Sequence, residues 1–330
     1  MSFGLRLNWP AVHRPLLDVV LLGILLVLSE NFKELWDWTT QRGFFCDDES
    51  LMYPYHSNTV SSSMLHWLGL YLPLLLLLIL ESCRCRRPLD SKWQQYWPVY
   101  NTLRWFLFGH VASSVLKNMG KHTIGRLRPH FFDICRPQLA DGGFCTDDAH
   151  RQGGVYHTVY TCVSGADTEL IFDAHISFPS GHSSMAFYGL VFVALHLQRI
   201  RRTLPDNMLR PLCQLVCVSI ASFVGLSRVM DYKHHWSDVV AGSLLGTLVA
   251  LAVVRAAEQE HRLHLLCIDQ KQQQQQNKQQ QNANTMAPQT VAVDKVVTSG
   301  SSQTEPASAA CEVGQQLPQD LSVVTCLSSN

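Results

Sequence analysis

The chain has 330 residues, a formal net charge of zero, and a composition that is 47% hydrophobic but only 16% charged. Charged residues make up about a quarter of an ordinary soluble domain, so the deficit indicates contact with lipid. The chain has no excess of basic residues, so its composition gives no support for nucleic-acid binding. The eleven cysteines form no CxxC pair, which disfavours zinc-ribbon and thioredoxin-like folds.

Several apolar stretches are long enough to cross a bilayer, which takes roughly 20 mostly apolar residues. In chain order they cover residues 16–36, 62–81, 98–117, 183–199, 210–228 and 238–256. The first and third are the weakest, because Asp18 and Glu30 interrupt one and Arg104 and His110 the other. No small-residue cleavage site follows the first, so it is expected to be retained. The pattern predicts an all-α, six-transmembrane helical bundle over residues 16–258.

The chain changes character after the last apolar stretch. Inside that stretch, Gly242 and Gly246 have the small-xxx-small spacing that suits close helix contact. Beyond it, residues 259–330 contain "KQQQQQNKQQQNANT" and then become rich in Ser, Thr, Ala and Pro. Such a segment has too little apolar surface to offset its ordering entropy, so we predict a disordered, Gln-rich tail.

Lys and Arg in the short connections predict the orientation, because they accumulate on the cytosolic side. The basic residues of two connections and of the N-terminus are Arg84, Arg86, Arg87, Lys92, Arg199, Arg201, Arg202, Arg210, Arg6 and Arg14. Residues 1–15 and the tail are therefore expected in the cytosol, where the tail could recruit a partner. Loops 37–61, 118–182 and 229–237 are expected outside the cell or in a lumen.

The cysteines agree with this orientation, since four of them fall in the predicted outer loops, where oxidation is possible. They are Cys46, Cys135, Cys145 and Cys162. We expect a disulfide within residues 135–162, and the sequence leaves its pairing open.

Three polar clusters lie at the predicted outer ends of the helices. The first is "KHTIGRLRPH", with Lys121, Arg126, Arg128 and Pro129; the second is the turn "PSGH", residues 179–182; the third is "SRVMDYKHHWSD", with Ser227, Arg228, His234, His235 and Asp238. Cations are uncommon in outer connections. Snorkelling toward lipid headgroups is one explanation for Lys121 and Arg128, and a functional site is the other.

Together these clusters can surround one oxyanion. Lys121, Arg128 and Arg228 supply positive charge, and guanidinium groups match phosphate oxygens with paired donors. A helix starting near Ser183 would add free amides at its N-terminus. Gly181 lets the backbone approach closely, and Ser180 can donate its hydroxyl or cap the helix.

The histidines add acid–base and nucleophilic chemistry to this anion site. His234 and Asp238 are four residues apart, so a helical start would place them on one face and let the carboxylate fix the imidazole tautomer. His182 would be the second, acidic imidazole, and both rings are expected to titrate near neutrality. A zinc site formed by these residues and His235 is the alternative, disfavoured because the neighbouring cations repel a divalent ion.

The three clusters resemble the motifs of the lipid phosphate phosphatases, the type 2 phosphatidic acid phosphatase family. The family motifs K-x6-R-P, P-S-G-H and S-R-x5-H-x3-D are filled in order here, and the likeness covers residues 16–256. It is greatest to the animal integral-membrane branch, including the insect wunen-type proteins. The resemblance implies His234, His182 and Asp238 as catalytic residues. It implies phosphate binding by Lys121, Arg128, Pro129, Ser180, Gly181 and Arg228.

The resemblance also implies an activity: hydrolysis of lipid phosphate monoesters through a phosphohistidine, on the non-cytosolic side, with no metal or other cofactor. The substrates it implies are phosphatidic acid, lysophosphatidic acid, sphingosine-1-phosphate and ceramide-1-phosphate. We expect a multi-pass plasma-membrane protein acting in phospholipid metabolism and signalling, and the resemblance allows a homo-oligomer. The alternatives are an inactive lipid-phosphate-binding relative, a channel or transporter, and a sugar-phosphate phosphatase.

Overall fold

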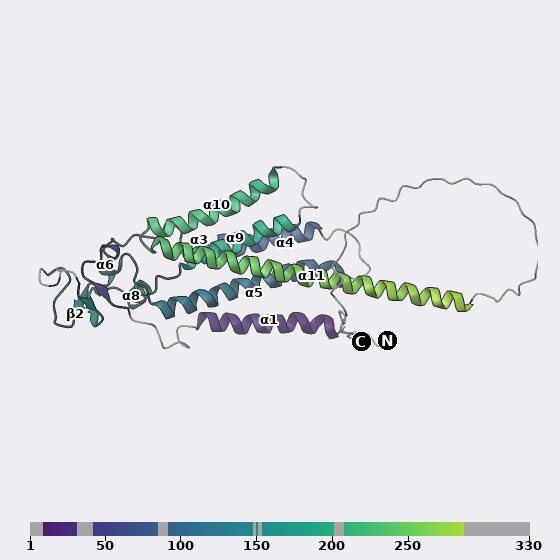
Figure 1. Ribbon diagram of the computed structural model, residues 1–330, viewed down its shortest axis with the longest axis horizontal. Coiled ribbons are helices and arrows are strands. Elements are labelled where there is room, and N and C mark those ends of the chain that lie inside the picture. The colour runs from purple at the N-terminus through teal and green to yellow at the C-terminus, as the bar shows by residue number, and fades with distance from the viewer. Residues whose placement is uncertain are drawn as a thin grey trace, which may run out of the picture. The chain divides into compact units, whose positions relative to one another are not determined.

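Long helices dominate the structure (Figure 1). The computed structural model describes residues 9–31, 42–84, 92–147, 150, 154–200 and 208–286. The long helices are α1 (Trp9–Glu30), a helix made of α3 (Ser62–His66), the π-helical turn η2 (Trp67–Tyr71) and α4 (Leu72–Arg84), and then α5 (Lys92–Ile124), α9 (Gly181–Arg199), α10 (Leu209–Met230) and α11 (Trp236–Met286). A long helix lies at each predicted apolar stretch, so the all-α prediction is confirmed.

Apolar length identifies part of this set as membrane spans. Three of the described helices are long and apolar enough to cross a bilayer: Ser62–Cys83, Leu209–Met230 and Trp236–Asn282. α1 contributes a shorter apolar segment, Pro15–Ser29. Large apolar side chains on the outward faces of α10 and α11 are exposed, including Leu215 at 62% and Leu248 at 62%. So much exposed apolar surface indicates a membrane protein.

The helices extend beyond the predicted segments at two places. The first helix begins at Trp9, inside the predicted N-terminal segment 1–15, and ends at Glu30; residues 32–36 lie outside the described ranges. α11 continues to Met286, so residues 259–286 are helical where we predicted disorder. Gln, Lys, Arg and Leu are good helix formers, and no Gly or Pro interrupts this segment. Residues 287–330 lie outside the described ranges.

Two of the residues that weakened the first and third predicted spans, Asp18 and Arg104, pair with each other. Arg104 of α5 donates to the carboxylate of Asp18 on α1 at 3.0 Å and also to Glu260 of α11. Trp105 adds a hydrogen bond from its indole N–H to Glu260 at 2.7 Å. Ionisable groups inside a helical bundle are tolerated when they are paired in this way. These contacts lie in one compact unit, which ends at His261.

The predicted outer loops form a small folded cap at one end of the bundle, where α6, α8 and β2 lie (Figure 1). Its elements are β1 (Phe44–Phe45), the 3-10 turn η1 (Glu49–Leu51), α6 (Phe131–Cys135), β2 (Pro137–Leu139), β3 (Tyr156–His157), β4 (Tyr160–Cys162) and α8 (Thr168–Ala174). β1 pairs with β3 and β2 with β4, both antiparallel. The cap has its own core, in which Phe44, Phe131 and Tyr160 are buried.

Two disulfides connect the cap, and the structure supplies the pairing that the sequence left open. Cys135 bonds to Cys162, within the predicted segment. Cys145 bonds to Cys46, which lies 99 residues earlier in the chain, before α3. Both bonds join segments that are distant in sequence, and they restrict the unfolded cap accordingly.

The glycine pair of the last span allows close contact between α11 and the start of α9. A Cβ atom at Gly242 would lie 2.4 Å from the carbonyl oxygen of Ser180. A Cβ atom at Gly246 would lie 2.2 Å from the carbonyl oxygen of Ser184. Both distances are too short for real atoms, so only glycine fits while the two backbones stay in place. The predicted role of these glycines in close helix contact is confirmed.

We expect Gly242→Ala to destabilise the protein by about 1–3 kcal/mol, because the added methyl group must push the α9 turn away from α11. The measurement is thermal unfolding of the detergent-solubilised variant, together with its phosphate release. Gly23→Ala on α1 is the matched control, because nothing lies within 4 Å of a Cβ atom there. Equal melting temperatures for Gly242→Ala and Gly23→Ala would contradict the close contact.

Candidate active site

A cavity of about 570 Å³ lies where the cap meets the bundle, and it brings most of the predicted site residues together. Those that line it are Lys121, Arg128, Gly181, His182, Arg228 and His234. They come from α5, the loop after it, α9, α10 and the loop before α11. Pro129, Ser180 and Asp238 are buried and are not among the lining residues.

The "PSGH" turn places the N-terminus of α9 at this cavity. Ser180 is the N-cap, and its hydroxyl oxygen accepts from the Ser183 amide at 3.5 Å and from the Ser183 hydroxyl at 3.1 Å. Of the two roles considered for Ser180, the structure therefore shows capping. Gly181 and His182 are the first residues of the helix, whose amides have no intrahelical acceptor. A helix start of this kind favours anions.

The two arginines at the cavity are held differently. Arg228, in the last turn of α10, donates to Asn58 at 3.0 Å and to Asp231 at 2.8 Å. Arg128 follows α5 and donates from Nη2 to Asp173 of α8 at 2.6 Å. Each guanidinium is buried, so its charge acts in surroundings of low polarity and attracts an anion more strongly than it would in water.

The four-residue spacing predicted a direct hydrogen bond between Asp238 and His234. The structure does not have this bond. His234 Nδ1 lies 4.0 Å from the nearer Asp238 oxygen, beyond hydrogen-bonding distance. The spacing argument fails because α11 starts only at Trp236, so His234 precedes the helix. Asp238, third in the helix, instead accepts from the His235 amide at 3.1 Å and from Arg126 at 2.6 Å.

Ser177 lies between the two residues. Its hydroxyl donates to Asp238 at 2.6 Å and lies 3.3 Å from His234 Nδ1. Because the serine proton is used by the carboxylate, the serine oxygen is left to accept, which assigns the donor role to His234 Nδ1–H. The other ring nitrogen, Nε2, then carries a free lone pair, and His234 lines the cavity. This is the tautomer that a nucleophilic imidazole requires.

The expectation that both imidazoles titrate near neutrality is wrong. Burial and the positive charges of Arg228 and Arg128 lower the pKa of His182 to about 3. Burial, together with the positive charges of Arg128 and Lys121, holds the pKa of His234 well below its ordinary value. The ring is therefore neutral at pH 7, the form in which it can attack. The second imidazole, His182, lines the same cavity, and among the described residues nothing hydrogen-bonds to its buried Nε2.

The zinc alternative does not match these contacts. The His235 ring nitrogen Nε2 lies 3.1 Å from the Leu127 carbonyl oxygen, and the carboxylate of Asp238 is occupied by its donors. Within the ranges that the structure describes, His, Cys, Asp and Glu form no group of three or more that could hold a metal ion.

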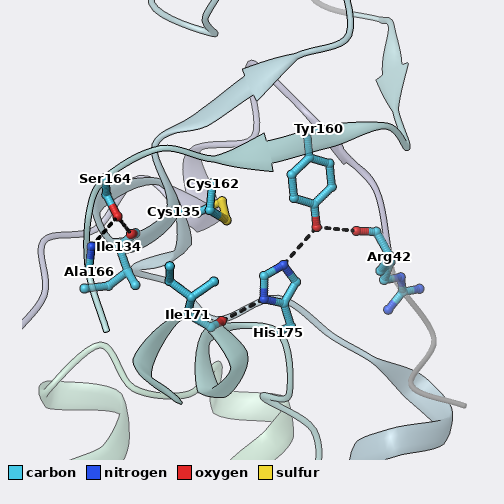
Figure 2. The surroundings of a disulfide bond; sticks show 9 residues. All are labelled: Arg42, Ile134, Cys135, Tyr160, Cys162, Ser164, Ala166, Ile171 and His175. Atoms are coloured by element: carbon cyan, nitrogen blue, oxygen red, sulfur yellow. Dashed lines mark hydrogen bonds between the residues drawn. A yellow bond between two sulfur atoms is a disulfide. The ribbon is translucent and has the colours of Figure 1, made fainter. Parts of the chain in front are cut away.

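The cap positions the residues behind the cavity, as the surroundings of the Cys135–Cys162 disulfide show (Figure 2). His175 bonds through one ring nitrogen to the Ile171 carbonyl at 2.7 Å and through the other to the Tyr160 hydroxyl at 3.0 Å. This ties the end of α8 to β4, next to the disulfide.

Two backbone hydrogen bonds then connect α8 to the site. The Arg128 amide donates to the Ala174 carbonyl at 2.9 Å, and the Ser177 amide donates to the Arg126 carbonyl at 2.7 Å. Residues 174–177 therefore run beside residues 126–128, and the cap holds both Arg128 and Ser177 in place.

Arg126, named in the first cluster, binds Asp238, and the sequence did not reveal four further residues of the site: Ser177, Asp173, Lys233 and Tyr55. Of these, Asp173, Lys233 and Tyr55 line the cavity, and the Lys233 ammonium lies 3.4 Å from the centre of the Tyr55 ring. Ser177 had one signal in the sequence, since it lies directly before the Phe178–Pro179 step into the "PSGH" turn. The others were indistinguishable from ordinary surface residues.

Comparison with known proteins shows the family of the chain. Residues 102–262 match the family model described as PAP2 superfamily. A putative phosphatidate phosphatase of Drosophila melanogaster is 38% identical over 70% of this chain, which spans 66% of the fly protein's length. Phospholipid phosphatase 1 of Rattus norvegicus is 34% identical over a match that covers 73% of this chain and 85% of the rat protein. Phospholipid phosphatase 2 of Homo sapiens is 36% identical over a match that covers 72% of this chain and 81% of the human protein. No solved structure matches the chain.

The helices and these relatives together define the class of the protein as a membrane-embedded phosphatase. The chain belongs to the PAP2 superfamily, within the group of its phospholipid and phosphatidate phosphatases.

Proposed function

We propose that the protein hydrolyses phosphate monoesters of membrane lipids through a phosphohistidine intermediate. The observation that carries the proposal is the cavity itself, in which four cationic side chains, a helix N-terminus and two imidazoles meet at the end of a membrane bundle. Phosphoryl transfer depends mainly on positioning and charge stabilisation, and the printed names of the relatives support a lipid substrate.

In the first step the phosphate binds to Lys121, Arg128, Arg228 and the amides at the start of α9. His234 Nε2 attacks phosphorus in line, so a P–N bond forms while the ester P–O bond breaks. Ser177 holds the Nδ1–H side of the ring and is itself fixed by Asp238. His182 gives a proton to the leaving lipid alkoxide, and the bound phosphate dianion favours protonation of His182 before that transfer.

In the second step His182, now neutral, takes a proton from water. The resulting hydroxide attacks phosphorus, the P–N bond breaks, and inorganic phosphate leaves a neutral His234. The fixed cations supply the charge that a metal ion would otherwise provide, so we propose turnover without metal or other cofactor.

We propose phosphatidic acid, lysophosphatidic acid, sphingosine-1-phosphate and ceramide-1-phosphate as substrates, since they share a phosphate monoester on a lipid. The basic connections and the two cap disulfides support an extracellular cavity, with both termini in the cytosol of a plasma-membrane protein. Self-association and a cytosolic partner of the tail remain predictions.

The test is phosphate release from a short-chain phosphatidic acid added to intact cells that express the protein. We expect release that EDTA leaves unchanged, because no step uses a metal ion. Release that appears only after permeabilisation would place the cavity on the cytosolic side. Loss of turnover of the purified protein in EDTA, restored by a divalent ion, would contradict the metal-free mechanism.

A further inference from the structure

Asp173, which belongs to none of the three polar clusters, contacts the phosphate site directly. It lies on α8 and lines the cavity that also contains Lys121, His182 and His234. Its Oδ1 accepts from Arg128 Nη2 at 2.6 Å. The Asp173 side chain is 43% exposed and that of Arg128 only 8%, so the carboxylate is the partner that faces solvent.

The ion pair between Arg228 and Asp231 provides a comparison, because its carboxylate is fixed by further hydrogen bonds. Asp231, its partner, is only 6% exposed and accepts both from the Thr59 amide at 2.8 Å and from the Thr59 hydroxyl at 2.6 Å. Among the residues that the structure describes, the Asp173 carboxylate accepts hydrogen bonds from Arg128 alone. Asp173 can therefore leave its arginine without breaking another hydrogen bond, whereas Asp231 cannot.

Phosphate and the Asp173 carboxylate need the same donor. Both are anions that guanidinium binds well. Asp173 takes only one N–H of Arg128, at Nη2, and the buried Nε makes no hydrogen bond within the described residues, so the guanidinium keeps donors for a ligand. A bound phosphate dianion would be repelled by a carboxylate this close, and the two would exchange places at Arg128 during each turnover.

We propose that Asp173 is a positioning residue that competes with phosphate for Arg128 and thereby speeds release of inorganic phosphate. It keeps Arg128 aligned while the cavity is open. The Asp173 carboxylate leaves the Arg128 guanidinium when the substrate phosphate binds. It bonds to the guanidinium again as the product phosphate leaves. The proposal rests on the proposed function, because it assigns Arg128 to the phosphate.

The test compares wild type with Asp173→Asn, which keeps the shape of the side chain and removes its charge. We expect inorganic phosphate to bind Asp173→Asn on the order of tenfold more tightly, because a repelling charge is gone. The product-inhibition constant of phosphate and the KM for short-chain phosphatidic acid should fall with it. The value of kcat should fall too, because product leaves more slowly. Isothermal titration with inorganic phosphate gives a readout that needs no turnover.

Asp167→Asn is the matched control. Asp167 also lines the cavity, but its carboxylate accepts from the Glu169 amide at the start of α8, and asparagine preserves such a cap. We expect phosphate affinity to stay at the wild-type value in this variant. If Asp173→Asn does not fold, Asp173→Ser provides the same comparison.

An unchanged or weakened phosphate affinity in Asp173→Asn would overturn the proposal, because it would show that the carboxylate only aligns Arg128. Failure of the proposed function would look different. Wild type would then release no phosphate from lipid, while titration with inorganic phosphate would still measure the effect of Asp173.

Discussion

His234→Ala is expected to release phosphate from short-chain phosphatidic acid at least about 1,000-fold more slowly than wild type. The substitution removes the imidazole that we propose as nucleophile, and covalent catalysis has no other route once that group is lost. The measurement is the initial rate of phosphate release by the purified variant in detergent micelles, compared at saturating substrate so that the change falls on kcat.

His235→Gln provides the control on the neighbouring imidazole. The His235 ring bonds to the Leu127 carbonyl, and a glutamine amide can donate to the same oxygen. We expect this variant to keep most of its activity. Turnover by His234→Ala close to that of wild type would eliminate His234 as the nucleophile.

His182→Ala is expected to lose about 100- to 10,000-fold in turnover of lipid substrates, the usual effect of removing a general acid and base. The loss should depend on the leaving group. An aryl phosphate, whose phenolate leaves without a proton, needs His182 only in the second step, so phosphorylated enzyme should accumulate. The measurement is a burst of phenolate and protein-bound phosphate that is labile in acid and stable in base.

The same variant separates His182 from a purely structural role. A structural defect would slow the lipid and the aryl substrate equally and would trap no phosphoenzyme. That outcome would remove His182 from the chemistry while leaving His234 as the nucleophile.

Hydropathy was enough to locate the long helices, because lipid requires an apolar run wherever a helix crosses it. It was not enough to set their ends. α5 extends from Lys92 to Ile124, well past the predicted 98–117, because a helix continues into polar surroundings as long as its residues allow it. The same reason carries α11 to Met286. The pairing of Arg104 with Asp18 and Glu260 joins residues on three helices, which no local pattern reveals.

Residue chemistry and motif order located most of the candidate site, and six of the nine predicted residues line one cavity. The contacts among them could not be predicted. Ser177 separates His234 from Asp238 because the start of α11 falls two residues after His234. Asp173 reaches Arg128 because the end of α8 runs beside residues 126–128, which lie 45 residues earlier in the chain. These contacts depend on tertiary structure. For His234 and Asp238, the four-residue spacing predicted a direct bond that the structure does not have.

The backbone contact between α11 and the "PSGH" turn has a consequence for how such enzymes diverge. With Gly242 and Gly246 against the carbonyl oxygens of Ser180 and Ser184, α11 accepts a larger residue at these two positions only if the start of α9 moves as well. A single substitution at either glycine therefore costs stability before it can alter the chemistry. We expect substitutions that change substrate preference to fall instead on the described surface residues of the cap, which can change one at a time while the reacting groups keep their positions.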